Sequence, residues 1–403
     1  MACGGVYCGI RRYDHCKFKV DKRGEDYYMH VLQVMSCIEY GGTEAFVYNH
    51  CKQILREHPS DEIALLICGN HINENRKKDF VKLGIRIYNS VVPSIKNYRV
   101  IVNTLQEIKN AWGVDVIHSH MNLGNVVIMH AAVKLNIAKR ISHSHDTAGY
   151  SGNPIRHFEQ LMRRNCMIKD ATDLLACSEK AGDYLYGKMF SECGKVIPNG
   201  INEVIYEADD TADIKMLRQE FDLENKFVLG NITRFDTKKN QIFLVEILEN
   251  LVDQIPDIVL VLGGVDGGEE QRLRQIVKEK HLLAHVRFVG VRQDIVQWMK
   301  LLDMWVMPSL FEGLPITLLE AQFSGLYCLV SDTVSEEADT GYGLIEYLKL
   351  QEDEWKKAII RYYKNPVHCD TTRLRVLNHQ SKFEIHNSAE MLYAVYKNDR
   401  SGK

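Results

Sequence analysis

Short apolar runs alternate with amphipathic stretches along almost the whole chain. In the first half, the runs that predict buried strands lie at Val31–Met35, Ile63–Cys68, Ile85–Asn89, Val114–His118, Arg140–His143 and Asp173–Cys177. Apolar positions with helical spacing lie between them, at Thr43–Arg56, Arg99–Trp112, Asn125–Leu135, Pro154–Lys169 and Lys180–Met189. Strands that alternate with helices in this way are typical of an α/β protein with a parallel sheet.

The alternation restarts in the second half. A short strand at Lys195–Ile197 meets the turn cluster Pro198-Asn199-Gly200, which indicates a change of domain. Strands are then predicted at Phe227–Thr233, Ile258–Gly263, Val286–Val289, Met304–Met307 and Tyr327–Val330. Helices are predicted at Asn240–Gln254, Glu269–Lys280, Asp294–Lys300, Pro315–Ser324 and Lys382–Tyr396. Two doubly wound, Rossmann-like parallel sheets facing a cleft explain the pattern, with domains at 29–194 and 195–380 and a helical C-terminal segment at 381–403.

The first 28 residues differ from the rest of the chain. They carry Cys3, Cys8 and Cys16 among mixed charges, without an apolar core or a signal-peptide pattern. Residues 23–25 can be encoded by a purine-rich ribosome-binding sequence just upstream of a start codon at Met29. We therefore expect Met29 to be the true start and the preceding segment to be non-native. A disordered native extension is the alternative.

Composition and charge indicate an ordinary globular protein. The 403 residues suffice for two domains with full cores, and the contents of 45% hydrophobic and 26% charged residues are average. The net charge of −3 gives no reason to expect a nucleic-acid partner, and no apolar run reaches the length of a membrane span. The 11 cysteines show no CxxC or metal-ligand spacing, which fits free thiols in a reducing compartment. A cytoplasmic location is therefore expected.

The run from Met307 to Gly325 carries the clearest candidate chemistry. It places Glu312 in a loop after a predicted strand and Glu320 inside the helix that follows. Pro315 suits the first helical position, and Gly325 suits the end of the helix. A lone glutamate on a helix is usually just solvated, but here a Glu-Gly-Leu-Pro turn and a small-residue stop surround the pair.

Between the two carboxylates, the backbone N–H groups at Gly313 and Leu314 open toward the helix N-terminus. Such a terminus is a ready site for an anion because its N–H groups are unpaired and the helix dipole favours negative charge. Two acids around a phosphate-sized site suit a ligand with a diphosphate and hydroxyl-rich ends. A nucleotide sugar is such a ligand.

Other polar clusters also follow predicted strands, where open parallel sheets bind ligands. Gly41 and Gly42 allow a phosphate or sugar to approach the backbone, although a Gly-Gly turn alone is a weak signal. No GxGxxG fingerprint and no GxxxxGK[ST] loop is present, which argues against a dinucleotide-binding domain and a P-loop. In the second half, Arg234 and Lys239 can converge on one diphosphate, with Lys238 as the competing lysine.

Two histidine pairs end predicted strands of the first half, at His118-Ser-His120 and His143-Ser-His145. A histidine at a strand end is often only structural, but for two pairs facing the expected cleft a functional role is as plausible as a structural one. A zinc site is not expected, because no third ligand has suitable spacing.

The Met307–Gly325 run closely resembles the donor-binding signature of the retaining glycosyltransferases of family 4, which have the GT-B fold. Arg234 with Lys239, Ile197-Pro-Asn-Gly-Ile201 and the Ser-His-Ser-His run add to the resemblance. It extends from Met29 to the C-terminal helix, and bacterial exopolysaccharide and capsule enzymes are the most similar members. One departure is Tyr327, where many members have proline. This position is expected to serve the structure and not the chemistry.

The resemblance implies roles for these residues. Arg234 and Lys239 would bind the diphosphate, Glu312 the sugar hydroxyls and Glu320 the ribose. His145 would lie near the reacting centre, and His120 would touch donor or acceptor. The nucleobase would lie against Val291 and Arg292. Asp266, displaced from the family's Gly-Asp-Gly loop, receives no role. The C-terminal helix would cross back to the first domain.

A retaining, metal-independent hexosyltransferase is therefore expected, which moves a sugar from a nucleoside diphosphate, for instance a UDP-sugar, to a glycan. The chain has no Asp-x-Asp motif, and neither a cofactor nor a metal is expected. The acceptor would be lipid-linked, and the helix at 155–169 could rest on an anionic membrane. It places three apolar side chains among four basic ones: Phe158, Leu161 and Met162 among Arg156, Arg163, Arg164 and Lys169. A core-facing helix with an ordinary solvated side is the alternative. A non-catalytic nucleotide-sugar-binding or scaffold protein is the alternative function.

Overall fold

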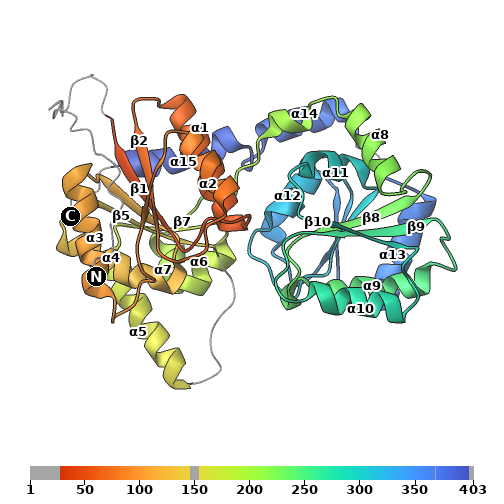
Figure 1. The fold of residues 1–403 in the computed structure, drawn as a ribbon, viewed down its shortest axis with the longest axis horizontal. Coiled ribbons are helices and arrows are strands. Elements are labelled where there is room, and N and C mark those ends of the chain that lie inside the picture. The colour runs from red at the N-terminus through yellow and green to blue at the C-terminus, as the bar shows by residue number, and fades with distance from the viewer. Residues whose placement is uncertain (1–27, 146–153, 368, 399–403) are drawn as a thin grey trace, which may run out of the picture.

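The computed structural model describes residues 28–145, 154–367 and 369–398, which form two lobes (Figure 1). The segment at 1–27, on which the hypothesis about Met29 depends, lies outside the described residues. Each lobe has one parallel sheet with helices on both faces. The α/β class with two Rossmann-like domains, predicted from the hydrophobic pattern, is confirmed.

The sheet of the first lobe has seven parallel strands in the order β3-β2-β1-β4-β5-β6-β7. Its strands are β1 (His30–Met35), β2 (Glu62–Ile67), β3 (Arg86–Asn89), β4 (Val116–Ser119), β5 (Lys139–Ser144), β6 (Asp173–Ala176) and β7 (Lys195–Val196). Its helices are α1 (Gly42–Glu57), α2 (Glu74–Lys82), α3 (Tyr98–Ala111), α4 (Asn125–Lys134), α5 (Pro154–Asp170), α6 (Glu179–Tyr186) and α7 (Lys188–Cys193). Because β7 pairs with β6, the first sheet includes Lys195 and Val196, beyond the expected boundary at 194.

The sheet of the second lobe has six parallel strands in the order β10-β9-β8-β11-β12-β13. Its strands are β8 (Phe227–Ile232), β9 (Ile258–Gly263), β10 (Val286–Gly290), β11 (Met304–Met307), β12 (Cys328–Ser331) and β13 (Ile345–Leu348). Its helices are α8 (Thr211–Glu220), α9 (Gln241–Leu251), α10 (Glu270–Glu279), α11 (Ile295–Leu301), α12 (Ile316–Phe323) and α13 (Glu352–Lys364). Single 3₁₀ turns lie at Asn122–Gly124, Glu203–Tyr206, Thr237–Lys239 and Glu336–Ala338.

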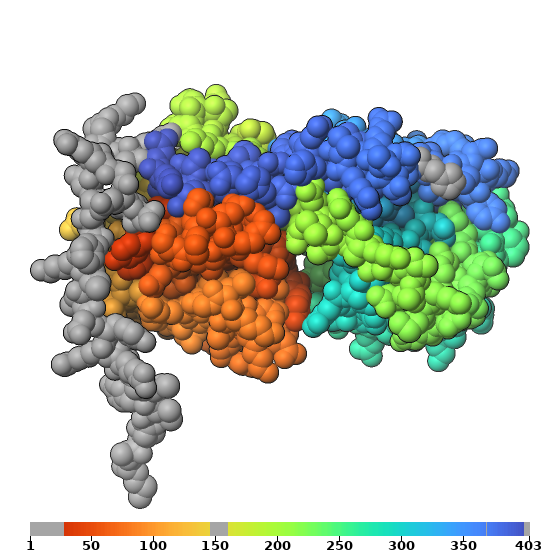
Figure 2. Space-filling view, turned by 90° about the horizontal axis from the view of Figure 1, so that it is seen from above, coloured from red at the N-terminus to blue at the C-terminus, as the bar shows by residue number. Residues whose placement is uncertain are grey.

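The chain ends with α14 (Thr371–Gln380) and α15 (Ile385–Lys397), which run over both lobes in the view of Figure 2. A bridge between Ile201 and Glu384 lies at the passage back to the first lobe. There α15 packs on α1, and the hydroxyl of Tyr396 reaches side chains of β1 and β4. The last helix therefore completes the core of the first lobe.

The order of the strands predicts where each lobe can bind a ligand. The order reverses between β1 and β4 in the first sheet and between β8 and β11 in the second. At such a switch point, the loops after the two strands leave in opposite directions and open a crevice beyond the carboxyl ends. Both crevices lie where the lobes face each other, so loops from two sheets can line one cleft.

Several elements were not predicted from the sequence: α2, α8, α13, α14 and β13. Helices α2 and α8 each bury a single side chain, Phe80 and Leu217, so their apolar pattern is weak. The stretch at Lys180–Met189, predicted as one helix, is divided between α6 and α7 at Gly187, whose φ of 61° breaks the helical path. Among the described residues, no helix is long and apolar enough to cross a membrane.

Candidate active site

A cleft of about 410 Å³ lies between the lobes, within the range of roughly 300–1,000 Å³ that small-molecule sites occupy. Residues that follow carboxyl ends of strands line it from both sides. From the first lobe these include Tyr40, Gly41, Gly42, Thr43, His145, Cys177 and Asn199. From the second lobe they include Thr233, Arg234, Lys238, Lys239, Gly264, Val291, Arg292, Glu312, Gly313, Leu314 and Glu320.

The loop between β11 and α12 forms one wall of the cleft. Glu312 forms a bridge with Val334, and the carbonyl of Leu314 accepts a hydrogen bond of 2.7 Å from the Asn199 amide. The structure corrects the expected position of Pro315, because α12 begins at Ile316 and the proline is its N-cap. The loop is thus held from both lobes, with the N-terminus of α12 beside the cleft.

The end of α12 follows from Gly325. Its φ of +78° is the left-handed conformation that a glycine adopts without strain. The N–H groups of Gly325 and Leu326 donate to the carbonyls of Gln322 and Ala321, which is a Schellman motif. Gly325 therefore stops the helix as predicted and fixes the length of the segment that carries Glu320.

Lys239 and Glu312 form an ion pair at the cleft, and each side chain is only 12% exposed. A 3₁₀ turn presents the lysine, and Asp236 caps this turn by accepting hydrogen bonds from the N–H groups of Lys238 and Lys239. Lys238 also lines the cleft, so position alone does not exclude this competing lysine.

Arg234 reaches across the cleft. Its Nη2 lies 3.4 Å from Oε2 of Glu39, and the two side chains are 40% and 34% exposed. The pair joins the loop after β8 to the loop after β1. Because both partners are partly solvated, the pair is weak enough for an anionic ligand to replace it.

Glu320 lies inside α12 and lines the cleft. Burial raises the pKa of its carboxyl group to about 7. Beside it, the hydroxyl of Tyr206 is buried and has no hydrogen-bond partner among the described residues. Burial, and then the charge of Glu320, raise the pKa of Tyr206 well above its usual value. Glu320 can therefore change its protonation state near neutral pH.

Val291 and Arg292 line the end of the cleft beyond β10. The guanidinium of Arg292 donates two hydrogen bonds to Asp294, of 2.8 and 2.6 Å, and Val291 is 54% exposed. This pairing holds the arginine beside an exposed apolar side chain. A flat ring can rest against such a surface.

Gly41 and Gly42 lie where α1 begins, on the opposite wall. Gly41 is the N-cap of the helix, and a Cβ at Gly42 would meet no atom within 4 Å. The backbone at Gly42 is therefore open to the cleft, and both glycines stay candidates for ligand contact.

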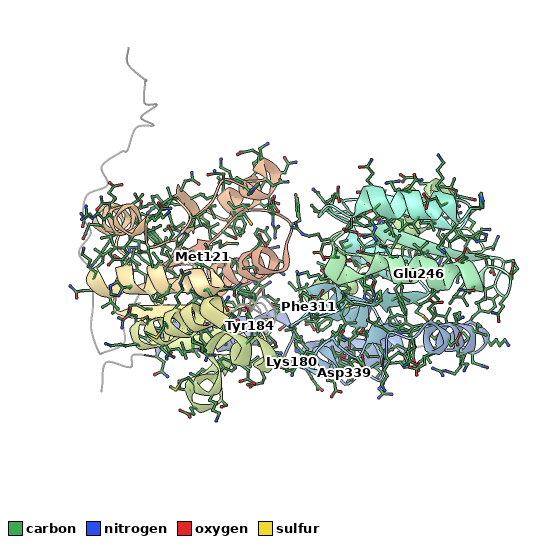
Figure 3. The ribbon with its side chains drawn as sticks, turned by 90° about the horizontal axis from the view of Figure 1, so that it is seen from below. Met121, Lys180, Tyr184, Glu246, Phe311 and Asp339 are labelled. Carbon is green, nitrogen blue, oxygen red and sulfur yellow. The ribbon has the colours of Figure 1, made fainter. Side chains whose placement is uncertain are left out.

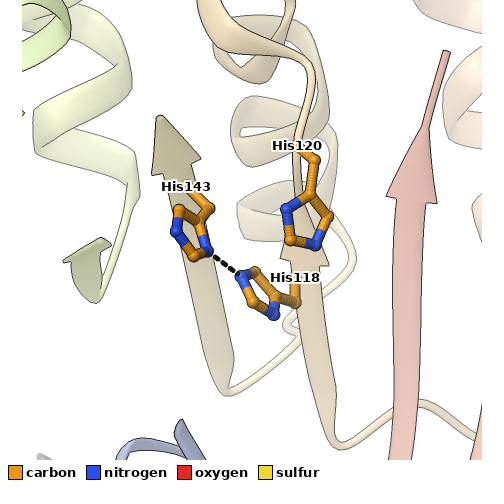
Figure 4. Close-up of side chains that lie close together, drawn as sticks. All are labelled: His118, His120 and His143. Atoms are coloured by element: carbon orange, nitrogen blue, oxygen red, sulfur yellow. Dashed lines mark hydrogen bonds between the residues drawn. The ribbon is translucent and has the colours of Figure 1, made fainter. Parts of the chain in front are cut away.

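The four strand-end histidines lie together, but only His145 lines the cleft. His120, predicted to touch donor or acceptor, is only 5% exposed, and its nitrogens bond His145 and Gln33. The spacing in the sequence offered no third metal ligand, but the fold brings three of the histidines together. Nitrogens of His118, His120 and His143 lie within 4.8 Å of one another (Figure 4), because β4 and β5 are neighbours.

Some residues of the site were not predicted from the sequence. Asn199 was seen only as part of a turn cluster, yet its amide holds the carbonyl of Leu314. Asp236 could have been found from its position before two lysines, where aspartate commonly caps a helical turn. Asp266, which received no role, accepts hydrogen bonds from the N–H groups of Gly268 and of Glu270, the first residue of α10.

A second contact joins the lobes beside the cleft. The carboxylate of Glu337 accepts hydrogen bonds from the N–H groups of Glu179 and Lys180, of 2.6 and 3.2 Å, at the start of α6. Figure 3 shows Lys180 of the first lobe and Asp339 of the second on facing sides of this junction. The favourable end of a helix dipole in one lobe thus holds a negative charge of the other.

Two family models match successive parts of the chain. Residues 40–204 match the model described as Glycosyltransferase Family 4, and residues 213–376 match the model of glycosyl transferases group 1. The putative glycosyltransferase EpsF of Bacillus subtilis is 30% identical over 82% of this chain and 87% of its own length. The capsular polysaccharide biosynthesis glycosyltransferase CapH of Staphylococcus aureus is 22% identical over 91% of this chain and 98% of its own length.

Among solved structures, Anabaena HepE in complex with UDP superposes with a TM-score of 0.71. The sequence identity is 20%, and the alignment covers 91% of this chain and 99% of HepE. HepE has also been solved in complex with UDP-glucose. At this identity, the likeness shows the shared fold.

Proposed function

The chain belongs to the family 4 glycosyltransferases, with the GT-B fold and relatives in bacterial polysaccharide biosynthesis, and from this we propose the reaction that it performs. The protein transfers a sugar from a nucleoside diphosphate to a glycan, with retention of the configuration at the anomeric carbon. The observation that carries the proposal is the convergence of Arg234, Lys239 and the N-terminus of α12 on one cleft.

These groups suit the charge that develops in the reaction. As the bond between the anomeric carbon and the phosphate oxygen breaks, negative charge collects on the leaving diphosphate. Fixed cations and helix N–H groups stabilise such charge without reorganising. The acceptor oxygen attacks from the same face, and its proton passes to the leaving phosphate. No protein nucleophile and no metal ion take part in the proposed steps.

Donor binding rearranges the two ion pairs. Arg234 is held by Glu39 and Lys239 by Glu312. A diphosphate at the N-terminus of α12 attracts both cations, while Glu312 turns its free oxygen to the sugar hydroxyls. In this proposal the carboxylate of Glu320 accepts hydrogen bonds from the ribose, and the base rests against Val291 and Arg292.

UDP is the proposed nucleotide. The fold neighbour HepE has been solved in complex with UDP and with UDP-glucose. The test is to incubate the protein with a panel of nucleotide sugars and to measure both binding and slow nucleotide release. Release with UDP-sugars supports the proposal. Binding without release, even with glycan added, supports the alternative of a non-catalytic binding protein.

Chelation tests the metal-free mechanism. Activity should survive EDTA, because the anion site is built from Arg234, Lys239 and backbone N–H groups. If EDTA abolishes transfer and manganese or magnesium restores it, the proposed mechanism is wrong.

The proposed acceptor is a lipid-linked glycan at an anionic membrane surface. Helix α5 supports this proposal, because Met162, Arg163 and Lys169 are exposed on it. Arg164 is less available than expected, since its guanidinium packs against Gly187. The side chains of Arg156 and Phe158 lie outside the part of the structure that is described.

A further inference from the structure

Behind His145, six side chains from four segments form one continuous chain of hydrogen bonds. One side chain comes from β1 and one from α15. Two come from β4 and the residue just beyond it, and two from β5 and the residue just beyond it. In order from the cleft they are His145, His120, Gln33, Tyr396, His118 and His143.

The five bonds all have ordinary lengths. His145 Nε2 lies 2.8 Å from His120 Nδ1, and His120 Nε2 lies 2.9 Å from Gln33 Oε1. Gln33 Nε2 donates to the Tyr396 hydroxyl at 2.9 Å, and this hydroxyl lies 2.8 Å from His118 Nδ1. His118 Nε2 then lies 3.0 Å from His143 Nδ1 (Figure 4).

All four histidines in this chain are neutral. Burial lowers the pKa of His118, His120 and His143 well below the usual value, and it lowers the pKa of His145 to about 3. A neutral imidazole has one nitrogen that donates and one that accepts. Each bond in the chain therefore fixes the direction of the next.

The amide of Gln33 sets that direction in the structure. Its oxygen requires a proton on His120 Nε2, so His120 Nδ1 is an acceptor and His145 must carry its proton on Nε2. On the other side, Tyr396 receives the amide N–H and donates its own proton to His118. The chain ends at His143 Nε2, which is buried without a partner among the described residues.

A hydrogen-bonded chain explains this histidine cluster better than a bound metal ion does. Zinc lies about 2.0–2.1 Å from a histidine nitrogen. His118 Nε2 and His143 Nδ1 lie 3.0 Å apart and share one hydrogen bond, which an ion would have to break before it could bind both nitrogens. Both nitrogens of His120 are also used by His145 and Gln33.

We propose that Tyr396 is a positioning residue that acts through Gln33 and His120 to hold His145 as the tautomer protonated on Nε2. The Nδ1 atom of His145 then keeps a lone pair that can accept a hydrogen bond from a hydroxyl of the bound sugar or acceptor. The C-terminal helix thus contributes to the cleft without touching it. The kinetic part of this inference rests on the proposed function, whereas the tautomer itself does not.

The test compares Tyr396→Phe with Tyr393→Phe. Tyr393 lies on the same helix and donates a buried hydrogen bond to Asp61, so its variant loses a similar bond outside the histidine chain. Nitrogen-15 NMR of labelled histidines, without substrate, reports which ring nitrogen carries the proton. The His145 signal is assigned by its loss in His145→Gln.

In the wild type and in Tyr393→Phe, we expect His145 to be protonated on Nε2. In Tyr396→Phe, both tautomers should appear, and kcat should fall about tenfold with little change in the donor KM, as expected for one hydrogen bond of the transition state. Gln33→Met interrupts the same chain from β1 and should give the same spectrum.

An unchanged tautomer in Tyr396→Phe, or wild-type His145 protonated on Nδ1, would overturn the proposal. So would stoichiometric zinc binding that shifts the signals of His118 and His143. If no glycosyl transfer is detected while the NMR result is as expected, the proposed function fails and the tautomer assignment stands.

Discussion

At the scale of single residues, Lys239 and Glu312 neutralise each other in the cleft, and a ligand must compete with this pair. We expect Lys239→Ala to lower kcat by about 10²–10³, the usual loss for one preorganised donor of charge stabilisation. The donor KM should also rise, because Glu312 loses its cation and repels the diphosphate. Steady-state kinetics with a fixed acceptor gives both constants.

Lys238→Ala is the matched control, since Lys238 lies in the same turn and also lines the cleft. Its activity should stay within a few-fold of the wild type. If the two variants exchange these outcomes, Lys238 is the diphosphate ligand. The double variant Lys239→Ala/Glu312→Gln should recover part of the donor affinity but not the turnover.

Glu320 should make donor binding depend on pH. Burial raises the pKa of this carboxyl group to about 7, so much of the free protein is protonated there at neutral pH. The ribose hydroxyls are donors to a carboxylate, so the donor Kd should decrease as pH rises from 6 to 8. In Glu320→Gln this part of the pH dependence should disappear. Calorimetric titration at several pH values measures the donor Kd of both proteins. If Kd depends on pH in the same way in the wild type and in Glu320→Gln, the ribose assignment is wrong.

The free energy of unfolding should fall as pH rises, whereas donor affinity should increase. The folded pKa of Glu320 lies above the ordinary carboxyl value of 4.5, so folding favours the protonated form. This contribution is present below about pH 4.5 and is lost as pH rises toward 7. The free energy of unfolding of the wild type should therefore fall relative to Glu320→Gln over that interval, by at most about 3 kcal/mol. Urea unfolding of both proteins at pH 5 and pH 8 measures the difference.

The sequence located most candidate residues because each follows the carboxyl end of a strand. Arg234, Lys239 and Glu312 line the cleft as this rule predicts. Glu320 also lines it, but from inside α12. Their partners were not predictable in the same way. Glu39 and Arg234 are 195 positions apart, and they meet only because the two lobes face each other. His120 also ends a strand but lies behind His145, and a strand-end position alone does not reveal whether another side chain lies in front of it.

At the scale of elements, Gly325 determines where α12 stops. We expect Gly325→Ala to lower the free energy of unfolding by about 1–2 kcal/mol, because a residue with a Cβ is strained at positive φ. The new Cβ would also lie 3.0 Å from Leu374 of α14. Thermal or urea unfolding measures the effect. Gly42→Ala is the control, since a Cβ there meets nothing within 4 Å, and its stability should change little.

Helix α3 is strongly periodic and was predicted well, whereas a helix with few buried side chains, such as α14, was missed. Helix α3 buries Ile101, Val102, Leu105 and Ile108 along one face, and its predicted bounds differ by only one residue at each end. Helix α14 buries only Asn378, because it lies on the surface of the second lobe, against the 3₁₀ turn at Glu203–Tyr206. Its formation depends on contacts with the rest of the protein rather than on a pattern of its own.

At the scale of the whole molecule, Glu337 helps to hold the lobes together. We expect Glu337→Ala to open the cleft, because the start of α6 loses the carboxylate that binds its N–H groups. A carboxylate at a helix N-terminus contributes about 1 kcal/mol, which corresponds to a roughly fivefold change in the ratio of closed to open forms. Small-angle scattering would show a larger radius of gyration. Glu336→Ala, in the same 3₁₀ turn but exposed, should leave the radius unchanged.

The placement of α5 gives the last prediction. The helix projects from the first lobe in Figure 1, and its exposed Arg163 and Lys169 are free to meet an anionic surface. Each basic residue near such a surface contributes roughly 1 kcal/mol at physiological salt. Arg163→Glu/Lys169→Glu should therefore abolish sedimentation with anionic liposomes and leave the release of UDP from the donor intact.

Lys215→Glu/Lys278→Glu makes the same change of net charge on exposed positions of the second lobe, and it serves as the control. Because these lysines lie on α8 and α10, away from α5, that variant should sediment nearly as the wild type does. Equal losses in both variants would mean that net charge alone governs adsorption. Wild-type protein that ignores the liposomes at low salt would refute membrane contact through α5, and the acceptor would then have to reach the cleft without help from this helix.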